Sequence, residues 1–149
     1  MKKFVEMEYK PRISSRRETR VLVLQALCEY DSVGHDPMEV LERGFNEYKI
    51  KNNFHIFAGD IVANVLENFV SMDTIISELA PDWPLMQIAM VDRNILRMAI
   101  AELVWCEDKV PEKAVLNEAV ELAKRFGSES SPSFVNGVLG SYMKIGTAV

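Results

Sequence analysis

Three arginines, Arg16, Arg17 and Arg20, stand at the beginning of an apolar run near the start of the chain. Ser15 and Glu18 have the spacing of a capping box, so the arginines are predicted to occupy the first turns of a helix. Cations there oppose the helix dipole, by about 0.3–1 kcal/mol each when exposed. A phosphate group would be attracted both by the arginines and by the unpaired N–H groups of the helix start, which indicates a face that binds RNA or DNA. An ordinary charged surface with ion pairs between helices is the alternative.

The distribution of charge limits how general such binding can be. Residues 1–20 hold seven basic and three acidic side chains, whereas residues 21–149 hold ten basic and nineteen acidic ones, for a net charge of −5. An acidic body with a basic beginning is not typical of a general nucleic-acid binder, but it can carry a local phosphate-binding face. Residues 1–13 are predicted to form a mobile basic arm, and residues 14–146 an RNA-binding domain.

Motifs that would indicate an enzyme are missing from the sequence. It contains no glycine-rich phosphate loop and no GxSxG elbow, and its two histidines provide little acid–base capacity. Glu118 and Glu121 are predicted to lie on a solvated helix face rather than to form a catalytic pair. The sequence therefore predicts a protein with no catalytic residues and no cofactor.

The two cysteines indicate a cytoplasmic protein. Cys28 and Cys106 lie far apart, each within an apolar run, which is typical of reduced thiols in a core. With His35 and His55 they show no short ligand spacing, so no metal site is predicted. No apolar run is long enough to span a membrane.

Apolar residues recur at helical spacing through most of the chain, and no strand is convincing. Asp36 and Pro37 have the types expected at a helix start, and Gly127 the type expected after a helix end. The fold class is therefore all-α, a single compact domain of seven or eight helices. The predicted helices cover residues 15–28, a segment from 37, then 53–70, 73–79, a short turn from 84, 92–107, 111–126 and 132–144.

The stretch SPSFVNGVLGSYM, residues 131–143, contains the hairpin-like pair Asn136-Gly137. Its apolar residues nevertheless follow a helical face, so a helix is predicted. Gly137, Gly140 and Ser141 then form a stripe of small residues, where two interior glycines cost roughly 1 kcal/mol each relative to alanine. Close packing of another backbone is one explanation, and accommodation of a partner protein is the other.

Four segments together resemble the NusB transcription antitermination family. They are RRETRVLVLQAL (16–27), VDRNILRMAIAEL (91–103), PEKAVLNEAVELAKRFG (111–127) and SFVNGVLG (133–140). The resemblance implies an all-α protein without catalytic activity. It further implies binding to the boxA element of ribosomal RNA leader transcripts together with NusE, a small-subunit ribosomal protein, within the RNA polymerase antitermination complex.

The resemblance also implies site residues. The RNA-binding candidates are Arg16, Arg17, Arg20, Arg93 and Lys124, and the partner-binding candidates are Asp92, Arg97 and Phe134.

Two residues depart from the family pattern, Cys28 and Ser130, and at Ser130 many members have an acid instead. Many members have a tyrosine, placed to meet RNA, where this chain has Cys28, which cannot stack on a base. The alternative function is a helical interaction module or homodimer, in which a second copy covers the arginine face and boxA is not bound.

Overall fold

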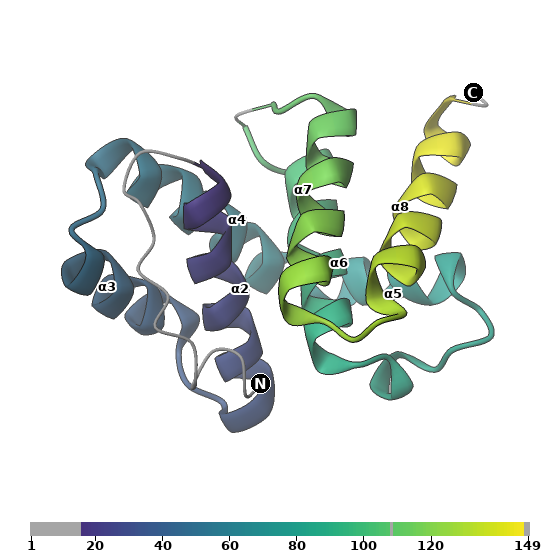
Figure 1. Cartoon of the computed structure of the whole chain (residues 1–149), viewed down its shortest axis with the longest axis horizontal. Coiled ribbons are helices and arrows are strands. Elements are labelled where there is room, and N and C mark those ends of the chain that lie inside the picture. The colour runs from purple at the N-terminus through teal and green to yellow at the C-terminus, as the bar shows by residue number, and fades with distance from the viewer. Residues whose placement is uncertain (1–15, 108, 148–149) are drawn as a thin grey trace.

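The computed structural model describes residues 16–107 and 109–147, and over these it contains seven α-helices and one short 3-10 helix (Figure 1). The predicted arm of residues 1–13 lies outside the described residues. None of the described helices is long and apolar enough to cross a membrane. The elements are α2 (Arg16–Val33), α3 (Pro37–Tyr48), α4 (Asn52–Glu67), α5 (Phe69–Leu79), η1 (Leu85–Gln87), α6 (Met90–Val104), α7 (Glu112–Phe126) and α8 (Ser131–Thr147).

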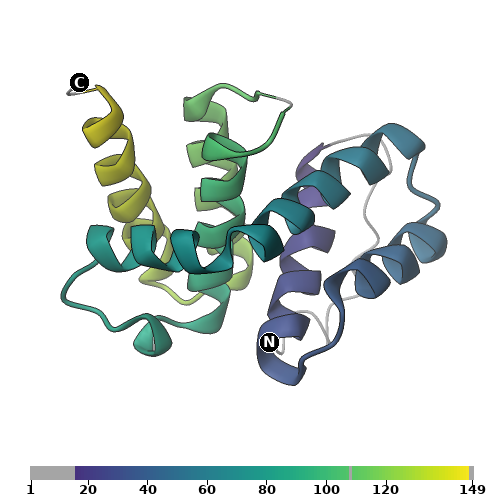
Figure 2. The same cartoon turned by 180° about the vertical axis from the view of Figure 1, so that it is seen from behind.

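Two groups of helices share the central helix α6. Helices α2, α3 and α4 pack against one another on one side, and α7 and α8 pack side by side on the other (Figure 1). Helices α4 and α5 follow one another across the opposite face of the molecule (Figure 2). Because α6 contacts α2, α4, α5, α7 and α8, it joins the two groups into one core. The predicted all-α domain is confirmed.

Helix α6 is buried around its whole circumference from Asp92 to Glu102. Its aliphatic residues explain most of this burial, as predicted for a central helix. The polar residues on it are buried as well, namely Asp92, Arg93, Asn94, Arg97 and Glu102. Buried charges require partners, so these side chains determine which neighbouring helices α6 can accept.

The prediction of one helix over residues 53–70, followed by a helix capped at Asp73, was wrong. The helix is interrupted at Asn68, whose backbone N–H and side-chain amide both donate a hydrogen bond to the carbonyl of Asn64. Helix α5 begins directly afterwards at Phe69 and continues through Asp73 to Leu79. Asp73 is therefore free of a capping role, and its carboxylate points instead toward α6, where it pairs with Arg97.

Two local predictions were correct. The Asp36 carboxylate accepts a hydrogen bond from the Met38 N–H at 3.0 Å, with Pro37 at the first helical position of α3. Residues 131–147 form the helix α8, including the Asn136-Gly137 pair.

Close packing does not explain the glycine stripe of α8. A Cβ atom added at Gly137 or Gly140 would have no neighbour within 4 Å among the described residues. Gly127 is the contrasting case, because a Cβ there would lie 2.5 Å from the Ser131 side chain and 2.8 Å from the Ala123 carbonyl oxygen. The compact turn between α7 and α8 therefore requires glycine at position 127.

Candidate nucleic-acid interface

Arg17 is the most exposed of the three arginines at the start of α2. Its side chain is 55% exposed and donates two hydrogen bonds to Glu118 on α7, Nε to Oε2 at 3.0 Å and Nη2 to Oε1 at 2.9 Å. The hydrogen bonds to Glu118 raise the pKa of Arg17, and the charges of Glu118 and Glu121 act in the same direction. Arg17 thus lies on an exposed seam between α2 and α7.

Lys124 is a second exposed cation, on α7. Its ammonium lies 3.2 Å from the carboxylate of Glu121, one turn earlier on the same helix, and its side chain is 57% exposed. Exposed ion pairs contribute only about 0–1 kcal/mol, so neither Arg17 nor Lys124 is held firmly by its acidic neighbour. Both cations can exchange that neighbour for a phosphate.

Arg20 does not belong to the exposed surface, and the expectation of a face made by all three arginines was wrong. Arg20 is 4% exposed and forms a bidentate ion pair with Glu102 of α6, at 2.8 and 2.7 Å. The guanidinium groups of Arg16 and Arg20 both lie over the ring of Phe57, at 4.9 and 5.1 Å from its centroid. Burial leaves the Arg20 guanidinium inside the protein, where it joins α2 to α6.

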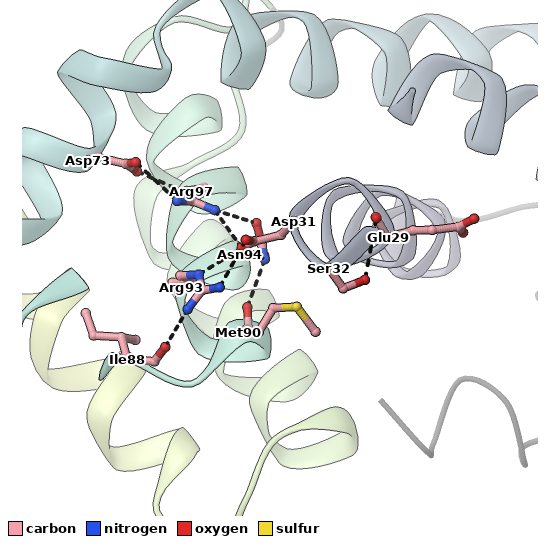
Figure 3. A network of polar contacts seen from close by, with 9 residues as sticks. All are labelled: Glu29, Asp31, Ser32, Asp73, Ile88, Met90, Arg93, Asn94 and Arg97. Atoms are coloured by element: carbon pink, nitrogen blue, oxygen red, sulfur yellow. Dashed lines mark hydrogen bonds and ion pairs between the residues drawn. The ribbon is translucent and has the colours of Figure 1, made fainter. Parts of the chain in front are cut away.

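Arg93 is likewise inside the protein, contrary to the exposure that an RNA contact requires. Its Nε and Nη2 donate to the carboxylate of Asp31 on α2, at 2.8 and 3.0 Å, and its Nη1 donates to the Ile88 carbonyl at 2.9 Å (Figure 3). Asn94 adds a hydrogen bond from Nδ2 to Asp31 at 2.9 Å. Arg93 therefore joins α2 to the segment that precedes α6.

Arg97 does not face a partner surface, so the structure does not support its expected role in partner contact. It donates to Asp73 of α5 at 2.9 and 3.1 Å, to Asp31 at 3.0 Å and to Asn94 at 3.1 Å (Figure 3). Its guanidinium also lies 4.4 Å from the centroid of the Phe69 ring. Arg97 thus holds α2, α5 and α6 together.

Asp31 is the acceptor shared by Arg93 and Arg97. Burial by itself would raise the pKa of Asp31, but the hydrogen bonds from Arg93 and Asn94 and the charges of both arginines together lower it. The carboxylate is consequently kept ionised between two buried guanidinium groups. A buried charge pair of this kind is costly to break, because the remaining partner is left without its counter-charge.

Asp92 and Phe134, both expected at a partner surface, meet in one pocket of about 270 Å³. Asp92 lies in the first turn of α6, and Phe134 lies in the first turn of α8. The other lining residues come from the segment before α6 and from the turn between α7 and α8: Trp83, Gln87, Ile88, Ala89, Ser128 and Ser130.

Asp92 has an unused acceptor in this pocket. The residue is 7% exposed, and its Oδ1 has no hydrogen-bond partner among the described residues. Burial raises the pKa of Asp92, although hydrogen bonding to Ser131 acts in the opposite direction. A buried carboxylate oxygen without a donor is unfavourable, so burial disfavours the ionised form of Asp92.

Sequence reasoning brought Phe134 forward but missed Trp83, the other aromatic residue of this pocket, and all the acidic partners of the arginines. Trp83 is exposed between Pro81 and Pro84, and an aromatic residue in such a turn was a usable signal. The acidic partners carried no such signal, because Arg17 and Glu118 are 101 positions apart and Arg20 and Glu102 are 82 positions apart.

The two cysteines are free thiols in the core. Burial raises the pKa of Cys28 to about 12, and that of Cys106 likewise to about 12. Cys28 is fully buried, so its side chain is not part of the arginine surface. Within the part of the chain that the structure describes, no cluster of histidine, cysteine and acidic residues could hold a metal ion.

The fold and the site define a single-domain, all-helical protein with exposed cations on α2 and α7 and a pocket at the start of its central helix. A family model described as "NusB family" matches residues 17–144. The chain belongs to the NusB family of transcription antitermination proteins, which are not enzymes.

Relatives and solved structures agree with this assignment. The chain is 44% identical over 129 residues to the transcription antitermination protein NusB of Roseiflexus sp. (strain RS-1), covering 86% of this chain and 91% of that protein. It is 43% identical over 129 residues to NusB of Pelotomaculum thermopropionicum, covering 85% and 87%.

The structure of NusB from T. maritima superposes with a TM-score of 0.81 at 33% identity, covering 89% of this chain and 93% of that one. A crystal structure of antitermination factors NusB and NusE in complex with dsRNA matches with a TM-score of 0.78 at 28% identity, covering 87% and 96%.

Proposed function

We propose that this protein binds the boxA element of ribosomal RNA leader transcripts together with NusE, and that the assembly helps RNA polymerase to read through terminators. Its work on nascent RNA would place it in the cytoplasm. The solved complex of a related NusB with NusE and RNA supports both partners. The observation that carries the proposal is that Arg17 and Lys124 are exposed cations, with side chains 55% and 57% exposed, each paired with one acid at the surface.

The exposed cations are the proposed phosphate contacts. Arg17 lies on the seam between α2 and α7, Lys124 is exposed on α7, and Arg16 stands next to Arg17 at the start of α2. Arg20 and Arg93 are not among these contacts, because both are buried, in pairs with Glu102 and Asp31. Phosphate contacts supply affinity and salt dependence, whereas sequence is read from unstacked bases.

The pocket is the proposed contact for NusE. Asp92 contributes an acidic side chain to the lining of the pocket, and Phe134 contributes an aromatic wall. When both partners are present, RNA that touches NusE as well as this chain binds more tightly than RNA bound to either alone, by linkage.

Gel-shift titrations with boxA RNA and a scrambled RNA, each with and without NusE, test the proposal. We expect preference for boxA and a gain in affinity when NusE is added. Equal affinity for the two RNAs would contradict it. Sedimentation of a dimer that is indifferent to boxA would favour the alternative in which a second copy covers the arginine surface.

The double variant Arg17→Ala, Lys124→Ala tests the phosphate contacts. We expect boxA affinity to fall about tenfold. The slope of log affinity against log salt should flatten by about 1.4, since each phosphate contact on a single strand contributes about 0.7. Arg43→Ala is the matched control, because Arg43 on α3 is also an exposed arginine in an ion pair, with Glu29 at 3.2 Å. An equal loss of boxA affinity in Arg43→Ala would contradict phosphate contacts at Arg17 and Lys124.

A further inference from the structure

One wall of the pocket beside Asp92 is formed by Gln87, the last residue of η1, and by Ile88 and Ala89, which link η1 to α6. Within this segment the Ile88 N–H bonds the Leu85 carbonyl at 3.1 Å, which closes η1. The Ile88 carbonyl points the other way and accepts from Nη1 of Arg93 at 2.9 Å (Figure 3). The side chain of Arg93 therefore holds the wall from inside the protein.

Arg93 is itself fixed from the other side by α2. Its Nε and Nη2 form a two-point pair with the Asp31 carboxylate, and the Arg93 and Asp31 side chains are both nearly buried. A guanidinium is a rigid planar fork, so fixing two of its nitrogens also fixes the direction of the third. The position of the Ile88 carbonyl is consequently set by where the end of α2 places Asp31.

Arg97 is a comparable buried arginine on α6 that does not line the pocket. It stands one turn after Arg93 on α6, is equally buried and shares the Asp31 carboxylate. Its remaining bonds reach Asp73 on α5 and the side chain of Asn94, and it lines no part of the pocket. Of these two buried arginines, Arg93 is thus the one that connects α2 to the pocket wall.

We propose that Arg93 is a positioning residue for partner binding: held by Asp31, it sets the Gln87–Ala89 wall of the pocket and couples that pocket to α2, the helix that carries the exposed arginines. This inference rests on the proposed function in one respect, namely that NusE occupies the pocket. It assigns Arg93 an internal role in place of the RNA contact expected from the sequence. Movement of α2 on RNA binding would reach the partner pocket through this pair of contacts.

Arg93→Met and Arg97→Met form a matched pair of variants. Each replaces a buried guanidinium with an unbranched apolar side chain, so both should lower the melting temperature. Only Arg93→Met should weaken NusE binding, by about tenfold, the effect of losing one hydrogen bond to a charged group. Calorimetric titration with NusE measures this difference, and boxA affinity of each variant without NusE should match that of the parent protein.

Trp83, which lines the pocket, provides a readout that needs no partner. In a Trp105→Phe background it is the remaining tryptophan. Its emission should shift to longer wavelength in Arg93→Met, where the wall loosens, and should be unchanged in Arg97→Met. The milder variant Asp31→Asn should lower NusE affinity in the same direction, and should add no further loss to Arg93→Met.

The outcomes separate this inference from the proposed function. Equal losses of NusE affinity in Arg93→Met and Arg97→Met, or no loss in Arg93→Met, would overturn the positioning role. If Arg93→Met does not fold, unchanged NusE affinity in Asp31→Asn would overturn it instead. If the parent protein does not bind NusE, the proposed function fails, while a Trp83 shift specific to Arg93→Met still supports the positioning role.

Discussion

Arg17 and Glu118 form a two-point ion pair across the exposed seam between α2 and α7, at 3.0 and 2.9 Å. The acid occupies the donors that a phosphate would use, so the proposed RNA surface is partly neutralised in the free protein.

Glu118→Gln should strengthen boxA binding. Removing the carboxylate frees Arg17 and takes away a negative charge beside the RNA, and an exposed pair contributes no more than about 1 kcal/mol, so the gain should be roughly twofold to fivefold. The melting temperature should change little. Glu42→Gln, an exposed acid on α3, is the control with the same change in net charge. A gain of equal size in Glu42→Gln would mean that net charge alone is responsible.

Arg20→Met should destabilise the fold without a specific effect on RNA. It leaves Glu102 buried and uncompensated, which costs about 3–5 kcal/mol in urea unfolding. Replacing Glu102 with Leu in the same chain should recover much of that loss, since two apolar side chains then fill the site. Reduced boxA affinity in the stable Arg20→Met, Glu102→Leu variant would indicate that Arg20 contacts RNA.

Asp92→Asn should stabilise the protein near neutral pH while weakening NusE binding. Burial raises the pKa of Asp92, so its ionised form is less favourable in the folded than in the unfolded protein. The free energy of unfolding of the wild-type protein therefore rises as the pH falls from above the pKa of Asp92 in the folded protein to its pKa in the unfolded protein. Near neutral pH, Asp92→Asn should be more stable than the wild type by on the order of 1 kcal/mol. This difference should shrink as the pH falls through the same interval. Urea unfolding at a series of pH values measures it. An advantage that is constant with pH would contradict the assigned cause.

Gly137→Ala should raise stability by about 0.5–1 kcal/mol, because alanine is the better helix former and a Cβ meets nothing within 4 Å. Gly127→Ala should lower stability, because its Cβ would collide with Ser131 and the Ala123 carbonyl. Thermal unfolding of the two variants provides the comparison. If NusE binds Gly137→Ala more weakly, the open stripe on α8 belongs to the partner surface. Destabilisation by Gly137→Ala would contradict its open position.

Helical spacing and start signals were enough to predict the architecture. Val115, Ala119, Leu122 and Phe126 repeat along one face of α7, and Asp36 with Pro37 begins α3, because these signals depend only on residues within a few positions of each other. The family motifs likewise identified the chain and brought Asp92 and Phe134 forward as candidates. The break at Asn68 was missed, since side-chain bonding to Asn64 competes with a helix pattern that otherwise continues.

Which arginines face solvent was decided only by tertiary structure. Arg16, Arg17 and Arg20 are equivalent when read along the chain, yet Arg20 meets Glu102, Arg17 meets Glu118, and Arg93 meets Asp31 62 positions away. A charge becomes internal or external according to the acid that packing brings beside it, and that acid comes from a different helix. Local sequence therefore determines which residues are cationic and helical, whereas the packing of α2, α6 and α7 determines which of them remain available to RNA.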